Sequence, residues 1–271
     1  MTEPEGGAID QVVAGVSHSA KYRRVSLDLI RAIAEQELAA HRKEKEAVKA
    51  VKNRLHQVCG AFFIGEPRYA TWLQAIEHAV QQGEPVALRA ACGEAMLKHT
   101  STRERLPIIE RFYAELVEGL APDSQILDIG CGLNPLAIPW MRLPERVTYT
   151  CYDIDAGLID FLNAYFAAMG ISGHAELRNV VTDPPHAPAS LALVLKVLPT
   201  LDQIRRDAGA ALLRGLAAPR MLVSFPAHSL GGVQKGMAAT YTARFLTLAD
   251  SERWQVRQIT FASEIAFLVT R

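Results

Sequence analysis

The strongest constraint on the fold is a short apolar segment, Gln125-Ile126-Leu127-Asp128-Ile129, that leads directly into Gly130-Cys131-Gly132. A buried strand that ends in glycines before a helix is typical of the first turn of a parallel α/β sheet. Periodicity predicts further strands at 147–152, 174–180, 190–196, 221–225, 255–261 and 264–269, with helices at 158–169 and 202–216. The last two strands have no helix between them, so we expect a hairpin at one edge of a seven-stranded α/β sheet.

The first 120 residues lack this alternation and show apolar residues at helical spacing. The pattern predicts helices at 26–38, 43–58, 67–83, 85–97 and 102–120. We therefore predict an all-helical N-terminal domain over residues 1–100 and an α/β domain over residues 101–271.

Composition indicates a globular cytosolic protein. Hydrophobic residues make up 49% and charged residues 21% of the 271, values typical of soluble domains. The apolar stretch 191–198 is too short to span a bilayer, and the acidic start of the chain does not resemble an export leader. The four cysteines have no CxxC spacing, so neither a metal site nor a disulfide framework is expected.

Charge is unevenly distributed along a chain whose net charge is zero. Between His18 and His56 there are ten basic and five acidic residues, an excess of five positive charges. Such a basic stretch fits either a solvated helical face with ion pairs or a surface that binds a polyanion.

The acidic residues around the glycine turn favour S-adenosylmethionine over a dinucleotide. Asp128 precedes the turn and suits a ligand with an amino group, while Asp153 ends the next strand, where a carboxylate accepts ribose hydroxyls. The third glycine of a dinucleotide fingerprint is replaced by Leu133-Asn134-Pro135. Upstream, Arg105 either holds the methionine carboxylate of the cofactor or belongs to a charged capping sequence on the surface.

Several segments together resemble one known family. They are 19–22, 55–61, Lys98-His99-Thr100-Ser101-Thr102-Arg103-Glu104-Arg105-Leu106, 127–135, Lys196-Val197-Leu198-Pro199 and Ser224-Phe225-Pro226. From about residue 11 to its end, the chain resembles the aminoglycoside-resistance 16S rRNA methyltransferases, which modify N7 of guanine 1405. The resemblance implies a Rossmann-like S-adenosylmethionine-dependent methyltransferase domain behind a helical domain that binds the ribosome.

The resemblance also implies roles for matched residues. Cofactor-binding positions are His99, Arg105, Asp128, Gly130, Gly132, Asp153, Asn179 and Leu198. Catalytic positions are Lys196 and Glu264, one or the other of which we expect to position the base. Positions facing the RNA are Lys21, Lys52, Arg54, Ser224, Phe225, Lys235 and Met237. Two departures stand out: Asn179 replaces an Asp near the adenine, and Val233 replaces an Arg whose phosphate contact Lys235 could supply.

Guanine N7 carries a lone pair and no proton, so its methylation needs positioning and no general base. The expected partner is 16S rRNA in the assembled 30S subunit, read mainly by shape, and nothing in the sequence indicates an obligate dimer, so we expect a monomer. Three alternatives are a small-molecule methyltransferase, an rRNA methyltransferase acting on a neighbouring adenine N1, and a catalytically silent ribosome-binding module.

Overall fold

A seven-stranded mixed sheet organises the second half of the protein in the computed structural model, which describes residues 5–40, 43–60, 62–117, 119–227 and 237–271. The strands are β1 (Gln125–Ile129), β2 (Thr148–Asp153), β3 (Gly173–Leu177), β4 (Leu191–Leu195), β5 (Arg220–Pro226), β6 (Gln255–Thr260) and β7 (Glu264–Thr270). Their order is β3-β2-β1-β4-β5-β7-β6, in which β1 to β5 run parallel. Strand β7 pairs antiparallel with both β5 and β6. The predicted strands and the edge hairpin are therefore confirmed.

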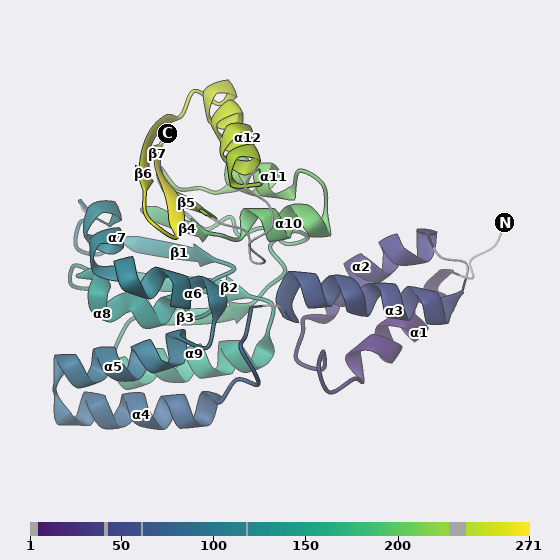
Figure 1. The fold of residues 1–271 in the computed structure, drawn as a ribbon, viewed down its shortest axis with the longest axis horizontal. Coiled ribbons are helices and arrows are strands. Elements are labelled where there is room, and N and C mark those ends of the chain that lie inside the picture. The colour runs from purple at the N-terminus through teal and green to yellow at the C-terminus, as the bar shows by residue number, and fades with distance from the viewer. Residues whose placement is uncertain (1–4, 41–42, 61, 118, 228–236) are drawn as a thin grey trace.

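Helices cover both faces of this sheet (Figure 1). They are α1 (Glu5–Ser17), α2 (Leu27–Ala40), α3 (Glu44–Leu55), α4 (Tyr69–Gln82), α5 (Pro85–Met96), α6 (Thr100–Arg105), α7 (Ile109–Leu116), α8 (Ile138–Met141), α9 (Ala156–Met169), α10 (Leu198–Ile204), α11 (Ala208–Gly215) and α12 (Met237–Ser251). Residues of α4, α5, α7, α8 and α9 share one core cluster with one face of the sheet, whereas α10, α11 and α12 share another with the opposite face. Side chains of β1 alternate accordingly, with Leu127 and Ile129 in one cluster and Ile126 in the other.

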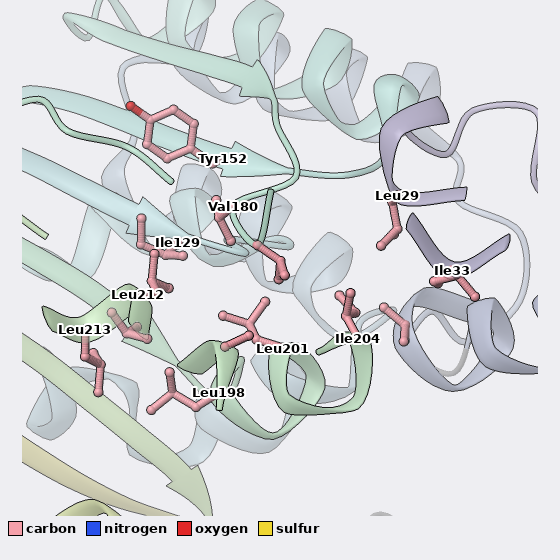
Figure 2. Close-up of a cluster of buried hydrophobic side chains, with 14 of the residues drawn as sticks. Leu29, Ile33, Ile129, Tyr152, Val180, Leu198, Leu201, Ile204, Leu212 and Leu213 are labelled. Carbon is pink, nitrogen blue, oxygen red and sulfur yellow. The ribbon is translucent and has the colours of Figure 1, made fainter. Parts of the chain in front are cut away.

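The first three helices form a lobe beside the sheet, which we call the helical lobe (α1, α2 and α3; Figure 1). Its Leu29 and Ile33 belong to the same buried cluster as Leu201 and Ile204 of α10, and Figure 2 shows these side chains gathered between the lobe and the sheet. A second junction lies at the end of β2, where Ser26 N–H donates to the carbonyl of Ile154 at 2.8 Å. The lobe is thus joined to the sheet by both apolar packing and backbone hydrogen bonds.

The next two helices share a core cluster with the sheet, whereas the buried residues of the helical lobe belong to the other cluster. Helix α4 contacts α9, and α5 contacts α8. The division of the chain at residue 100 stays a prediction, and this packing places residues 69–96 in the α/β layers.

Several predicted helices differ in detail. The helix predicted at 102–120 is interrupted by a 3-10 turn at Leu106–Ile108, because Pro107 has no N–H to donate within a helix. The helix predicted at 202–216 is divided into α10 and α11, since Arg205 is extended and Asp207 has a φ of +60°. Helices α1 and α12 were not predicted. Within the described residues, no helix has the length and apolar character needed to cross a membrane.

Candidate active site

A cavity lies over the glycine turn, at the carboxyl ends of β1, β2 and β4. Among the predicted cofactor residues, those that line it are His99, Arg105, Gly130, Gly132, Asp153 and Asn179, and Lys196 lines it as well. Ligands of open α/β sheets bind at this edge of the strands. Predicted residues from five separate segments are therefore brought together in one wall.

Both glycines of the turn are required by its geometry. Gly130 and Gly132 have φ angles of +60° and +50°, a region in which residues with a Cβ are strained. An added Cβ would lie 2.5 Å from Val197 Cγ2 at Gly130, and 2.7 Å from His99 Cε1 at Gly132. The turn thus packs closely against the residues that follow β4 and precede α6.

Asp153 ends β2 and is tied to the turn by its carboxylate. Its Oδ2 accepts a hydrogen bond from Gly132 N–H at 2.9 Å, and its Oδ1 accepts one from Ile154 N–H at 2.7 Å. Each carboxylate oxygen has a second lone pair. The group can therefore still accept from two vicinal hydroxyls of a ligand.

Arg105 is buried at the base of the cavity, with 1% of its surface exposed. Its Nε and Nη2 donate to the two carboxylate oxygens of Glu264 at 3.1 and 2.7 Å. Burial alone would raise the pKa of Glu264, but the charges of Arg105 and Lys196 hold that pKa below its usual value. The pair is therefore ionised, and the positive charge of Arg105 lies in the cavity wall.

A second buried group, Asn134, also contacts Arg105 and was not predicted. Arg105 Nη1 donates to Asn134 Oδ1 at 2.8 Å, and Asn134 Nδ2 donates to Asp128 Oδ2 at 2.9 Å. Asp128 itself does not line the cavity, so it is placed behind Asn134. The sequence feature that could have identified Asn134 is its position directly after the glycine turn.

Lys196 lies at the end of β4 in a strained backbone conformation, with a φ of +59°. Its Nζ lies 2.9 Å from Glu104 Oε2 and 3.4 Å from Glu264 Oε2. The side chain is 3% exposed. Lys196 and Glu264 thus belong to one buried charge cluster with Arg105, and their catalytic role stays a prediction.

Two buried polar atoms in the cavity wall have no partner within the described part of the chain. They are His99 Nδ1 and Asn179 Nδ2. Burial lowers the pKa of His99 to about 3, and the charges of Arg105 and Lys196 act in the same direction, so the ring is neutral. Buried polar groups are normally paired. Unpartnered atoms beside a glycine cradle therefore fit a wall that receives a polar ligand such as S-adenosylmethionine.

Other predicted site residues lie elsewhere. Leu198 does not line this cavity and packs in the core with α10 and α11. Ser224 is fully buried and donates to Glu264 Oε1 at 2.5 Å, while Phe225 stacks on Tyr241 at 6.1 Å. Neither presents free surface to a target base, and their predicted contact with it stays a prediction.

Two further predicted RNA contacts lie at or beside residues that the structure does not describe. Lys235, together with Val233, lies outside the described residues, and Met237 is the first residue of α12, with its side chain outside the description.

The predicted phosphate contacts of the helical lobe have different surroundings. Lys21 is exposed and lies 3.1 Å from His56 Nδ1, and Lys52 is half-buried. Arg54 pairs with Glu37 at 2.9 Å and donates to the carbonyl of Gln203 at 2.6 Å. Arg54 therefore links α3 to α10 in this structure, and its contact with RNA stays a prediction.

Comparisons with known proteins agree with this geometry. A family model described as ribosomal RNA methyltransferase (FmrO) matches residues 18–269. A 16S rRNA (guanine(1405)-N(7))-methyltransferase from Frankia casuarinae is 39% identical, with 97% of this chain and 94% of the relative covered. A relative of the same name from Micromonospora echinospora is 35% identical, with 97% of this chain and 97% of the relative covered.

A solved structure extends the likeness to the fold. The 16S rRNA methyltransferase RmtF, in complex with S-adenosyl-L-homocysteine, matches with a TM-score of 0.82 at 30% identity, covering 100% of this chain and 99% of that one. The predicted fold class is therefore confirmed. With its helical lobe, its 3-2-1-4-5-7-6 sheet and near-complete coverage by these relatives, the chain belongs to the 16S rRNA (guanine-1405 N7) methyltransferase family.

Proposed function

We propose that the protein transfers a methyl group from S-adenosylmethionine to N7 of guanine 1405 in 16S rRNA and thereby confers aminoglycoside resistance. The observation that carries this proposal is the cavity over the glycine turn, with Asp153 and Arg105 in its wall. A carboxylate at the end of β2 suits ribose hydroxyls, and a guanidinium suits a carboxylate. These are the two polar ends of S-adenosylmethionine.

Named residues would hold the cofactor. Arg105 would bind its methionine carboxylate, Asp153 its ribose, and Gly130 and Gly132 would let the backbone approach it. Asn179 Nδ2, a free donor, suits a ring nitrogen of the adenine. When bound, S-adenosylmethionine supplies an electrophilic methyl group on a sulfonium and leaves as S-adenosylhomocysteine.

The chain's own contribution is positioning and electrostatics. The N7 lone pair is free, so no proton is removed at the attacking atom, and His99, neutral and buried, need not act as a base. Lys196 and Glu264 act from within the buried charge cluster. We expect Lys196→Ala to reduce methylation strongly while S-adenosylhomocysteine still binds, as measured by calorimetry beside a methylation assay. Unchanged methylation would remove Lys196 from the mechanism.

The substrate is 16S rRNA within the assembled 30S subunit, bound by the exposed cations of the helical lobe, and the enzyme acts as a cytoplasmic monomer. Neutralising Lys21 therefore weakens methylation of 30S subunits and leaves cofactor binding unchanged. The affinity for 30S falls steeply with salt. An affinity for 30S subunits that does not change with salt would contradict electrostatic binding of RNA.

The deciding experiment maps the modified nucleotide. Purified 30S subunits are incubated with enzyme and S-adenosylmethionine, and the 16S rRNA is then analysed by primer extension and mass mapping. We expect a new methyl group on N7 of guanine 1405. A mark on an adjacent adenine N1 would reassign the target, and no mark despite bound cofactor would favour a small-molecule enzyme or a silent ribosome-binding module.

A further inference from the structure

Asn134 lies between the cavity and the buried side of the sheet. It opens the 3-10 turn Asn134–Ala137, is 2% exposed, and lines the cavity together with Arg105. Each of its two polar side-chain atoms has two hydrogen-bond partners. Oδ1 accepts from Arg105 Nη1 at 2.8 Å and from Tyr113 OH at 2.5 Å, and Nδ2 donates to Asp128 Oδ2 at 2.9 Å. The second partner of Nδ2 is the Tyr149 hydroxyl, at 3.4 Å.

These partners fix which way the amide points. Arg105 has only donors, so the side of Asn134 that faces it must be the carbonyl oxygen. Asp128 accepts on the opposite side, and Tyr149 OH donates to the same Asp128 Oδ2 at 2.7 Å. A flipped amide would set a donor against the guanidinium and an acceptor against the carboxylate. The network therefore allows one orientation of Asn134.

The donors of Arg105 can be counted. A guanidinium has five N–H groups. Glu264 takes one on Nε and one on Nη2, and Asn134 takes one on Nη1. Tyr113 also hydrogen-bonds Arg105. Glu264 and Asn134 thus hold the guanidinium from two sides, in a residue that lines the cavity.

We propose that Asn134 is a positioning residue that orients Arg105 toward the methionine carboxylate of the cofactor, with Asp128 fixing the amide from behind. This inference rests on the proposed function, because it assumes that the cavity binds S-adenosylmethionine. Asn134 acts through Arg105 and touches no reacting atom. Its loss should weaken recognition of the amino-acid end of the cofactor and spare recognition of the nucleoside end.

The test compares two ligands that differ at that end. S-adenosylhomocysteine carries the carboxylate, whereas 5′-methylthioadenosine keeps the nucleoside and the thioether and lacks the amino-acid group. Both are titrated by calorimetry into the full-length wild-type protein and Asn134→Leu, with thermal unfolding recorded for each. A matched control is Asn163→Leu, because Asn163 bonds both backbone groups of Ala175 at 2.8 and 2.9 Å and does not line the cavity.

We expect Asn134→Leu to raise the Kd of S-adenosylhomocysteine about tenfold to a hundredfold, as for loss of a charge-assisted hydrogen bond. The Kd of 5′-methylthioadenosine should change less than about threefold. Asn163→Leu should lower the melting temperature without changing the ratio of the two constants. An equal loss for both ligands in Asn134→Leu, or no loss for either, would overturn the proposal. If the wild type bound neither ligand, the proposed function itself would fail.

A charge swap tests the same inference without an apolar residue in the core. Asn134→Asp alone sets two carboxylates within hydrogen-bonding distance of each other, so we expect it to lose affinity for S-adenosylhomocysteine. Adding Asp128→Asn restores a donor facing an acceptor and should recover affinity at least fivefold. No recovery in the double variant, with an unchanged melting temperature, would refute the link between these two positions.

Discussion

Replacing Asp128 by Asn should stabilise the protein at neutral pH and not at acidic pH. Asp128 is 1% exposed and is the next-to-last residue of β1. Burial raises its pKa to about 6, and hydrogen bonds from Asn134 and Tyr149 oppose that rise only in part. Its second oxygen, Oδ1, has no partner among the described residues. The carboxylate is therefore held ionised at neutral pH against a desolvation cost.

The magnitude follows from proton linkage. In the unfolded chain this carboxyl has a pKa of 3.8, so between about pH 4 and pH 6 the folded protein binds more protons than the unfolded one. The free energy of unfolding therefore falls as pH rises through this window. A difference of about two pKa units corresponds to roughly 3 kcal/mol. Asp128→Asn keeps an acceptor for Asn134 and Tyr149 and removes the ionisation.

The assay is urea unfolding of the wild type and Asp128→Asn from pH 4 to pH 7.5, analysed as the difference between the two proteins at each pH. Other carboxyl groups titrate in both proteins and cancel in that difference. We expect the two to be similar near pH 4 and the variant to be more stable by up to about 3 kcal/mol above pH 6. A difference that does not change with pH would refute the assignment of this pKa to Asp128.

Three further predictions concern the glycine turn, the adenine end and the helical lobe. Gly130→Ala should abolish cofactor binding in calorimetry, because its Cβ would lie 2.5 Å from Val197 Cγ2, whereas Gly170→Ala, with φ of +61° and open space, should cost only about 1 kcal/mol of stability. Asn179→Leu should weaken S-adenosylhomocysteine and 5′-methylthioadenosine alike, about tenfold, and a loss confined to one ligand would contradict an adenine contact. Arg54→Ala should lower the free energy of unfolding by about 2 kcal/mol in denaturant titrations, and an unchanged value would show that its contacts to α10 do not stabilise the fold.

The sheet could be predicted from the sequence because each strand is a short apolar run bounded by turn residues. Strand β4, Leu191–Leu195, is buried at every position, as expected for a central parallel strand. The ends of the helices were harder to predict. Pro107 interrupts one predicted helix, and nothing in the local pattern distinguishes α10 from α11 before the left-handed backbone at Asp207 is seen.

Site residues could be predicted where their role follows from their position at the end of a strand. They could not be predicted where the role depends on a contact between residues far apart in the sequence. Gly130, Gly132 and Asp153 follow directly from strand ends. The contact of Asn134 with Arg105, by contrast, joins residues 29 positions apart. Glu264, whose role in positioning the base stays a prediction, is fully buried and faces Arg105. Alternation along β7 directs it to the same face as Ser224 of β5.

The segment that continues the helical lobe forms part of the wall of the cavity. The π-helical turn His56–Gly60 continues α3, and its Val58 and Cys59 line the cavity. Just beyond it, Phe63 meets the His99 ring edge-on at 5.1 Å, and His99 in turn packs against Gly132. The turn that continues α3 and the glycine turn therefore border the same cavity, so a displacement of α3 would change the wall that faces the proposed cofactor.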